Sequence, residues 1–168
     1  MVPGGGRRGQ RAREQRGALT GPNPVDRGKS GAKRHVLTDT SGLPLAVAVS
    51  AANTHDSLAL IPLVQAIPAI RSRRGPRRRR PDKLHARLGY DYPHLRCWLR
   101  SRRITPRIAR RGIETSERLG RHRWVVERSL AWLTGYRRLT LRYERCARLF
   151  TAFLTLAAAL TCYKKLAT

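Results

Sequence analysis

Residues 33–50 read KRHVLTDTSGLPLAVAVS, and this stretch decides the fold. Two runs rich in strand-forming residues, Arg34–Asp39 and Leu43–Ser50, flank the turn residues Thr-Ser-Gly. An aspartate at the start of such a turn can accept hydrogen bonds from the backbone that follows it. The stretch therefore predicts a β-hairpin whose turn is opened by Asp39.

Downstream of the hairpin the sequence alternates between helical and extended patterns. Apolar residues recur at helical spacing after Asp56, which predicts a helix over Ser57–Ile67 with that aspartate as its N-cap. The elements expected next are a strand in KLHARLG (83–89), a helix over Tyr92–Arg102, a strand in ITPRIA (104–109), and helices over Arg121–Leu133 and Arg145–Lys165. This order predicts an α/β fold in which a mixed sheet is covered by helices.

The last two expected helices supply most of the predicted core. The first is expected to bury Trp124, Val125, Leu130, Trp132 and Leu133, and the second Leu149, Phe153, Leu156, Ala157 and Leu160. Trp98 also lies at a helical position, so we expect all three tryptophans to pack in the core rather than stack on bases. No two of the three cysteines have the spacing of metal ligands, and we expect reduced, buried thiols.

The charge of the chain is far from balanced. It has 36 Lys and Arg against 10 Asp and Glu, which gives a formal net charge of +26. Such a chain repels itself unless a polyanion screens it, and nucleic acid is the commonest such partner. A GC-rich genome also favours arginine codons, but it does not explain why acids are so scarce.

The ends of the sequence indicate where the protein acts and how it is organised. Residues 1–20 are rich in Gly and Arg without periodicity, and we expect a disordered arm there, followed by one domain over 21–168. The start lacks the apolar core of a signal peptide. The longest apolar stretch, Phe150–Tyr163, is too short to span a bilayer. We therefore expect a cytoplasmic, nucleoid-associated protein with no membrane partner.

Three segments, in this order and at these intervals, resemble a known family. They are TGPNPVDRGKSGAKRHVLTDTSGLPLAVAVSAANTHDS (20–57), ARLGYD (86–91) and RHRWVVERSLAWLTGYRRL (121–139). Together they resemble the DDE transposases of bacterial insertion sequences, of the insertion sequence 5 family, from about Arg11 to Lys165. The resemblance implies a ribonuclease-H-like fold and transposition of DNA at the ends of the element. It also implies two Mg²⁺ ions, held by three carboxylates, that drive strand cleavage and transfer.

Only one of the family's three carboxylates has a counterpart here. Glu127 in RWVVER matches the third acid, and Arg123, four residues earlier, would lie near the scissile phosphate; an ordinary surface ion pair is the alternative. Arg87 stands where the pattern A-D-x-G-Y-D has its second aspartate, and Asp91 is expected to face elsewhere. The first acid and its strand are missing, since residues 4–8 read GGGRR. We therefore expect a partial catalytic domain, with Glu127 as the remaining metal ligand and no metal bound.

Basic residues outside this triad are candidates for contact with double-stranded DNA. The resemblance suggests that Lys29, Lys33, Arg34 and His35 line the DNA groove, although a solvated strand end is the alternative. Arg77, Arg78, Arg79 and Arg80 are expected to contact phosphates. The sequence also leaves open a homo-oligomer. Two other functions stay open: a catalytically dead DNA-binding fragment, and a basic RNA-binding protein, which would not explain the motifs.

Overall fold

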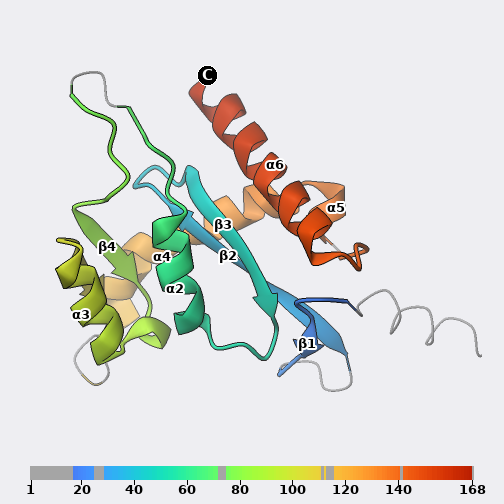
Figure 1. Ribbon diagram of the computed structural model, residues 1–168, viewed down its shortest axis with the longest axis horizontal. Helices are drawn as coiled ribbons and strands as arrows, with labels where there is room; N and C mark the ends of the chain where they lie inside the picture. The colour runs from blue at the N-terminus through green and yellow to red at the C-terminus, as the bar shows by residue number, and fades with distance from the viewer. Residues whose placement is uncertain are drawn as a thin grey trace, which may run out of the picture.

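The computed structural model describes residues 17–24, 29–71, 75–110, 112, 116–140 and 142–167, and for 116–123 the backbone only. The elements are β1 (Gly21–Pro22), β2 (Ser30–Thr38), β3 (Pro44–Ala51), η1 (Asp56–Ala59), α2 (Leu60–Gln65), β4 (Lys83–Ala86), η2 (Leu88–Tyr90), α3 (Pro93–Ser101), β5 (Thr105–Ile108), α4 (Ser116–Thr134), α5 (Arg137–Thr140) and α6 (Ala147–Leu166) (Figure 1). The predicted α/β class is confirmed. Most of the predicted N-terminal arm lies outside the described residues.

The hairpin forms as predicted. β2 pairs with β3 in antiparallel register, with Lys33 opposite Ser50 and Val36 opposite Val47. Asp39 opens the turn: its Oδ1 accepts hydrogen bonds from the backbone N–H groups of Ser41 (2.9 Å) and Leu43 (2.8 Å). The turn chemistry predicted from Asp39 is therefore confirmed.

The described strands form two separate sheets. β1, β2 and β3 make an antiparallel sheet in that order, whereas β4 and β5 are paired in parallel. Parallel strands need a crossover, and here α3 connects β4 to β5 and packs against the pair. Antiparallel and parallel pairing therefore both occur, as expected for a mixed arrangement, but no pairing joins β2 to β4 within the described residues.

Two apolar clusters hold the helices to the strands. The first joins α2 and α3 to β4 and β5 through Leu60, Val64, Leu84, Leu95, Leu99 and Ile108, among others. The second joins α4, α5 and α6 to the hairpin through Leu133, Leu139, Phe150 and Leu154, with Val36, Val47 and Val49 packed against it. Helices thus lie against both groups of strands, as the α/β class requires.

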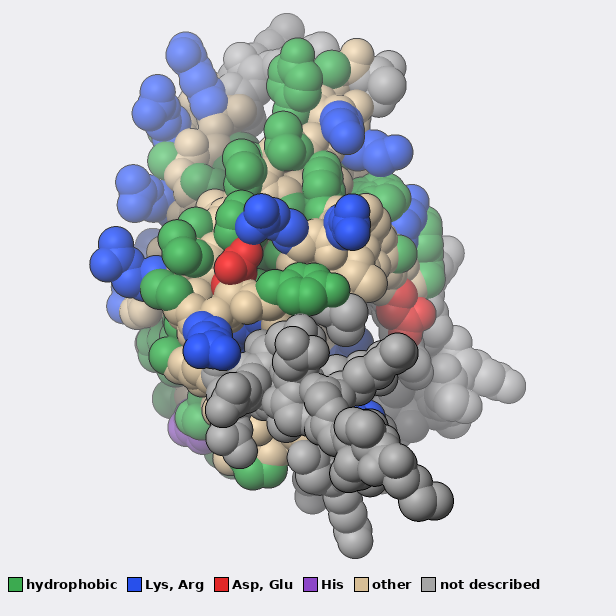
Figure 2. All heavy atoms as spheres, turned by 90° about the vertical axis from the view of Figure 1, so that its right-hand side faces the viewer, with side chains coloured by type: hydrophobic (Ala, Val, Ile, Leu, Met, Phe, Trp, Pro, Cys, Tyr) green, Lys and Arg blue, Asp and Glu red, His purple; other side chains and the backbone are tan. Residues whose placement is uncertain are grey.

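α6 buries a different stripe from the predicted one. Its buried residues are Phe150, Leu154, Ala157, Ala158 and Thr161. Of the predicted residues Ala157 is buried and Phe153 is partly buried, whereas Leu149, Leu156 and Leu160 are exposed. The helix is apolar on more than one side, so spacing alone did not decide which side faces β3. Figure 2 shows the outcome, with apolar side chains gathered on the outer surface that carries this helix.

α6 is also the one described helix long and apolar enough to cross a membrane by length and composition. The sequence predicted that the apolar stretch Phe150–Tyr163 is too short to span a bilayer. The helix that contains it is longer, since α6 runs from Ala147 to Leu166. Its buried side packs against β3 and α4. Of the most apolar 18 residues of this helix 28% is buried inside the structure, so most of α6 is exposed.

α4 docks onto the turn of the hairpin through a polar contact that the sequence did not indicate. Ser129 is fully buried, and its Oγ donates to the carbonyl oxygen of Gly42 at 2.6 Å. Gly42 has φ +88°, and a Cβ there would lie 3.1 Å from Ser129 Oγ. The turn therefore requires glycine both for its backbone conformation and for the close approach of α4.

The predicted core face of α4 is partly wrong. Val125 and Leu133 are buried as expected, but Ser129 completes their stripe and Trp124 is half exposed. The three buried residues are spaced by four, which places them on one side of the helix. Trp124 lies one position off this stripe, so it faces outward.

Candidate nucleic-acid interface

An open cleft of about 710 Å³ lies between the two sheets. Ala32–Leu37 of β2 form one side, and Leu84, His85 and Ala86 of β4 form the other. α2 and α4 also line it, and in Figure 1 α2 lies in front of this region and the paler α4 behind it. The cleft brings together several residues that the sequence singled out, so we describe each of them in turn.

Arg87 lies directly after β4, at one end of the cleft. It caps the short turn η2 with extended backbone angles, φ −73° and ψ 169°, and its side chain is exposed. Burial raises the pKa of the neighbouring Tyr90, as does Asp56, while Arg87 lowers it. Since η1 contacts η2, Asp56 and Arg87 lie at the same end of the cleft. The residue expected to replace the second acid thus stands at the carboxyl end of a strand, where a ligand in the cleft would meet it.

Asp91, the nearest acid in sequence to Arg87, is already paired. Its Oδ1 accepts from Nη2 of Arg96 at 2.7 Å and from Nε at 2.8 Å. The same guanidinium donates to the carbonyl oxygen of Ile108 at 2.9 Å, which ties α3 to the end of β5. Asp91 does not line the cleft, so it faces elsewhere, as expected from its position four residues after Arg87.

Glu127 lies on α4, and its side chain is exposed. Its neighbour Val126, together with Leu130, lines the cleft, whereas Glu127 does not. Arg123 lies in the same helix by its backbone, and its side chain is outside the described residues. Their predicted pairing on one helical face therefore stays a prediction.

The carboxylates of the described residues do not fit a two-metal centre. No group of three or more His, Cys, Asp or Glu side chains gathers in the described part of the chain. The cleft is lined by one acid, Asp56, together with Lys33, Arg34 and Arg87. Hard divalent cations need several oxygen ligands whose charge offsets their own, and this donor set does not supply them.

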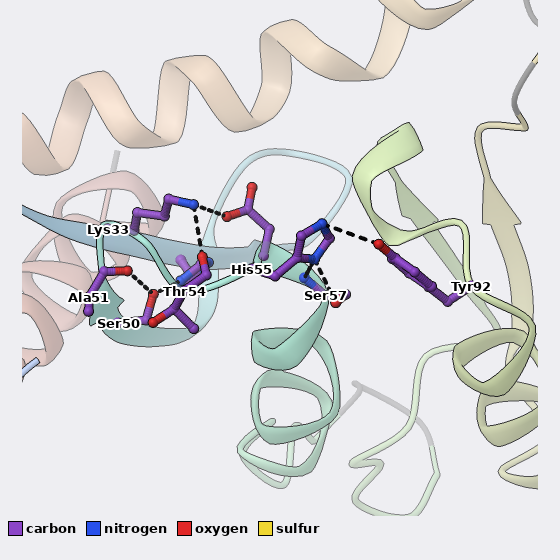
Figure 3. A network of polar contacts seen from close by, with 9 residues as sticks. Lys33, Ser50, Ala51, Thr54, His55, Ser57 and Tyr92 are labelled. Atoms are coloured by element: carbon purple, nitrogen blue, oxygen red, sulfur yellow. Dashed lines mark hydrogen bonds and ion pairs between the residues drawn. The ribbon is translucent and has the colours of Figure 1, made fainter. Parts of the chain in front are cut away.

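A polar network joins the start of β2 to the segment after β3 (Figure 3). Lys33 Nζ donates to the carbonyl oxygen of Thr54 at 2.9 Å and to Oδ1 of Asp56 at 3.0 Å. His55 continues the network, since its Nε2 lies 3.3 Å from the hydroxyl of Tyr92. Through these contacts Lys33 and Asp56 hold β2 to the segment that follows β3.

His55, rather than Asp56, caps the helical segment after β3. Its Nδ1 accepts from the backbone N–H of Ser57, and Asp56 is free of this role because it pairs with Lys33. The segment is also shorter than the predicted helix over Ser57–Ile67, since it consists of η1 followed by the six residues of α2. The expectation that Asp56 caps this segment is therefore wrong, since its neighbour His55 provides the cap.

Two of the predicted DNA-contacting residues on β2 are turned inward. His35 is buried, its Nε2 lies 2.7 Å from Ser50 Oγ, and burial lowers its pKa. Arg34 is partly buried, donates to the carbonyl oxygen of Leu139, and its pKa is lowered by burial. His35 lines the cleft with a buried, hydrogen-bonded ring, and its predicted contact with DNA stays a prediction. Lys29, before β2, is exposed.

The run Arg77–Arg80 is exposed along its whole length. The loop that carries it is held by one bridge, in which Ile70 and Arg78 exchange backbone hydrogen bonds of 2.9 and 2.8 Å. The four side chains are thus displayed on an anchored loop rather than on a free one. This geometry is suited to contact with a polyanion.

Sequence reasoning missed a stacked cluster on α4. The guanidinium of Arg128 lies over the rings of Trp124 (4.3 Å to the centroid) and Trp132 (4.9 Å). It also donates to the carbonyl oxygen of Ser41, and its buried Nε has no hydrogen-bond partner among the described residues. The i, i+4, i+8 spacing of Trp, Arg and Trp was the available signal. Because Trp124 is half exposed, the expectation that all three tryptophans pack in the core is wrong.

The cysteines are free, and they are less buried than expected. Cys97 and Cys146 are exposed and Cys162 is partly buried. Cys146 occupies the N-cap of α6, where the nearby backbone N–H groups of Leu149 and Arg148 lower the pKa of its thiol. The buried positions predicted for these thiols are therefore wrong for Cys97 and Cys146.

Two comparisons with known proteins show which family the chain belongs to. Residues 7–162 match a family model described as "Transposase DDE domain". The chain is 48% identical over 147 residues to a protein of Burkholderia cepacia described as "Putative transposase for insertion sequence element IS402". The match covers 88% of this chain and 70% of that relative. No solved structure matches the chain.

Proposed function

Because the chain belongs to the family of transposase DDE domains, we propose that it binds the DNA ends of an insertion sequence without cutting them. A transposase function follows from the family, and so does DNA as the partner. The loss of catalysis is our own inference. It rests on one observation, the position of Arg87 at the carboxyl end of β4.

The electrostatic consequence of that arginine is large. Two unit charges 4 Å apart interact by about 4 kcal/mol at an effective dielectric of 20, and a Mg²⁺ ion carries two charges. Arg87 is exposed, so solvent screening reduces this repulsion. Nevertheless, an aspartate at this position would attract the metal, whereas the guanidinium repels it. The family uses divalent metal, and the described residues of this chain gather no ligand cluster of three around Glu127.

DNA binding rests on the exposed cations instead. Arg77–Arg80 project from an anchored loop, and Lys29 is exposed before β2. Arg123 is proposed as a further contact on α4, as in the family. Lys33 and Arg34 already pair within the protein, so we assign them a smaller share of the binding. We expect these contacts to fix the position on the DNA backbone rather than to read its sequence.

Such a protein would act as a DNA-binding fragment that competes with an intact relative for the same ends. A homo-oligomer and association with the nucleoid are compatible with this role. RNA binding is the second candidate, favoured only by the net charge of +26. The family match speaks for duplex DNA.

Salt-dependent binding to duplex DNA and to a structured RNA of equal length tests the proposal. The protein is expected to prefer the duplex, with a slope of log K against log salt that grows with the number of phosphates the protein neutralises. Replacing Arg77, Arg78, Arg79 and Arg80 by glutamine is expected to reduce that slope by about 0.9 for each phosphate that the variant no longer neutralises.

A matched control removes the same charge elsewhere. Arg100, Arg102, Arg103 and Arg107 are also exposed, and their replacement by glutamine is expected to change the slope less. Equal slopes for the two variants would refute the assignment of the loop. A preference for the RNA would refute duplex DNA as the partner.

A further inference from the structure

Three cations line the cleft between β2 and β4, and the fold uses two of them. Lys33 is paired with Asp56, and Arg34 donates to a carbonyl oxygen of α5. The third is Arg87, whose guanidinium has no hydrogen bond or ion pair with any of the described residues. It stands at the carboxyl end of β4 with its side chain exposed. Arg87 is therefore the cation of this cleft that an external anion can reach.

A short turn places Tyr90 next to Arg87. The backbone N–H of Tyr90 donates to the carbonyl oxygen of Arg87 at 3.0 Å, which closes η2 between the two residues. Tyr90 also lines the cleft, and its hydroxyl makes no hydrogen bond to the described residues. Burial raises the pKa of Tyr90, so the hydroxyl keeps its proton at neutral pH and can donate it in a hydrogen bond.

Gly89, between these two residues, leaves open space beside the backbone. A Cβ at this position would meet no atom within 4 Å, and Gly89 is not among the glycines of the described chain that have positive φ. Neither packing nor backbone conformation therefore requires glycine here. The missing side chain lets a ligand approach the backbone closely, and Gly89 also lines the cleft.

The charges around this end of the cleft favour an anion over a cation. Asp56 is the one acid among the described residues that line the cleft, and its carboxylate lies 3.0 Å from Nζ of Lys33. The residues of α4 that line the cleft carry no charge. The carboxylate of Asp56 is thus offset by Lys33, and the positive charge of Arg87 remains.

A phosphodiester group matches these donors. Its two unesterified oxygens share a negative charge, and the planar guanidinium of an arginine donates to such an oxyanion through two parallel N–H groups. A hydroxyl beside the guanidinium can donate to a remaining oxygen lone pair. Phosphate contacts of this kind fix the position of a protein on DNA and carry no base sequence.

We propose that Arg87 and Tyr90 form a binding site for one phosphate of the DNA backbone, which the guanidinium contacts directly and without a metal ion. The proposal rests on the proposed function, because the phosphate belongs to the bound DNA. Arg87 then has two effects. It excludes a divalent cation from the end of β4, and it supplies the positive charge that a phosphate needs there.

Duplex binding in EDTA, measured at several salt concentrations, tests the proposal on the full chain. Arg87→Gln removes one phosphate contact and is expected to reduce the slope of log K against log salt by about 0.9. Arg87→Lys keeps the charge and should keep the slope. The matched control Arg107→Gln removes an exposed cation of β5 that does not line the cleft, and should change the slope by less than about 0.3.

Two variants that leave the charge unchanged test the geometry. Tyr90→Phe removes the hydroxyl donor and should lower the affinity about fivefold with an unchanged slope, whereas Tyr143→Phe, at an exposed tyrosine outside the cleft, should not. Gly89→Ala places a methyl group in the open space beside the backbone. It should also lower the affinity roughly fivefold, in a chain whose free energy of unfolding is not reduced.

The possible outcomes separate the phosphate site from DNA binding as a whole. A wild-type slope in Arg87→Gln, or wild-type affinity in both Tyr90→Phe and Gly89→Ala, would overturn the site. Duplex binding that still depends on Arg77–Arg80 would in that case leave the proposed function standing. Duplex binding that requires Mg²⁺ would also contradict the site, because the guanidinium alone makes its ionic contact. Absence of duplex binding at every salt concentration would overturn both.

Discussion

Replacing Leu154 by alanine tests which side of α6 belongs to the core. Leu154 is fully buried and packs with Leu133, Leu139 and Phe150, whereas Leu156, two residues on, is 55% exposed. A buried Leu→Ala change costs about 2–5 kcal/mol, because transfer energy is lost and a cavity remains. At about 3 kcal/mol the melting temperature of a chain of this size falls by roughly 6–12 °C.

Leu156→Ala is the matched control on the same helix. Its side chain is mostly solvated, so its removal should change the free energy of unfolding by no more than about 0.5 kcal/mol. Urea unfolding of both variants, followed by circular dichroism and extrapolated to water, measures the difference. A loss for Leu156→Ala as large as that for Leu154→Ala would refute this packing of α6. It would favour instead the stripe predicted from the sequence, or a partner covering the outer side.

Two further predictions concern the hairpin. Ser129→Ala removes the donor to the buried Gly42 carbonyl and should lower the free energy of unfolding by about 1–3 kcal/mol. The control Ser101→Ala, at an exposed hydroxyl, should lower it by less than about 0.5 kcal/mol in the same denaturation assay. Similar costs would contradict the docking of α4. Burial lowers the pKa of His35, so as the pH falls the unfolded chain takes up a proton at this residue before the folded chain does. The stabilisation is therefore present above about pH 6.5 and should be lost as the pH falls through the pKa of His35 in the folded state. Thermal unfolding between pH 7.5 and 5 should show this loss in the wild type and less of it in His35→Gln; an equal loss in both would exclude His35 as its source.

The hairpin was predictable because its signals are local and agree with one another. The strand-forming runs and the turn at Asp39 specify the same structure, and the observed contacts of Asp39 follow from that sequence. Most of the later elements were placed within a few residues, as for α3, predicted over Tyr92–Arg102 and found over Pro93–Ser101. α4 is an exception, since it begins at Ser116 rather than at the predicted Arg121. The short helix α5 had no such signal and was missed.

The sides of the last two helices were harder to predict, because that choice is made by tertiary contacts. α6 carries leucine or phenylalanine on several sides, and the buried side is the one that fits β3 and Leu133. On α4 the core stripe includes Ser129, where leucine and tryptophan residues were expected, and the Ser129 hydroxyl donates to the carbonyl oxygen of Gly42. Both helices thus contact residues that lie far from them in the sequence, and a local pattern does not indicate such contacts.

In the candidate site, too, local features were predictable and features set by tertiary contacts were not. The position of Arg87 at a strand end agrees with the motif in which it stands, whereas the inward orientation of His35 depends on Ser50 across the hairpin. Asp56 was assigned a cap that His55 provides, and the Asp56 carboxylate pairs with Lys33. Residue type and spacing therefore suggested candidate residues, and long-range pairing decided which of their side chains are exposed.

The most direct test of our account is a strand-cleavage assay on duplex DNA that carries the terminal repeats of the element, in Mg²⁺ and in Mn²⁺. With Arg87 beside the cleft and no carboxylate cluster in the described residues, we predict DNA binding without nicking or joining. Nicking by the purified chain that disappears in Glu127→Gln would contradict that prediction, since it would mean that a metal centre assembles despite Arg87.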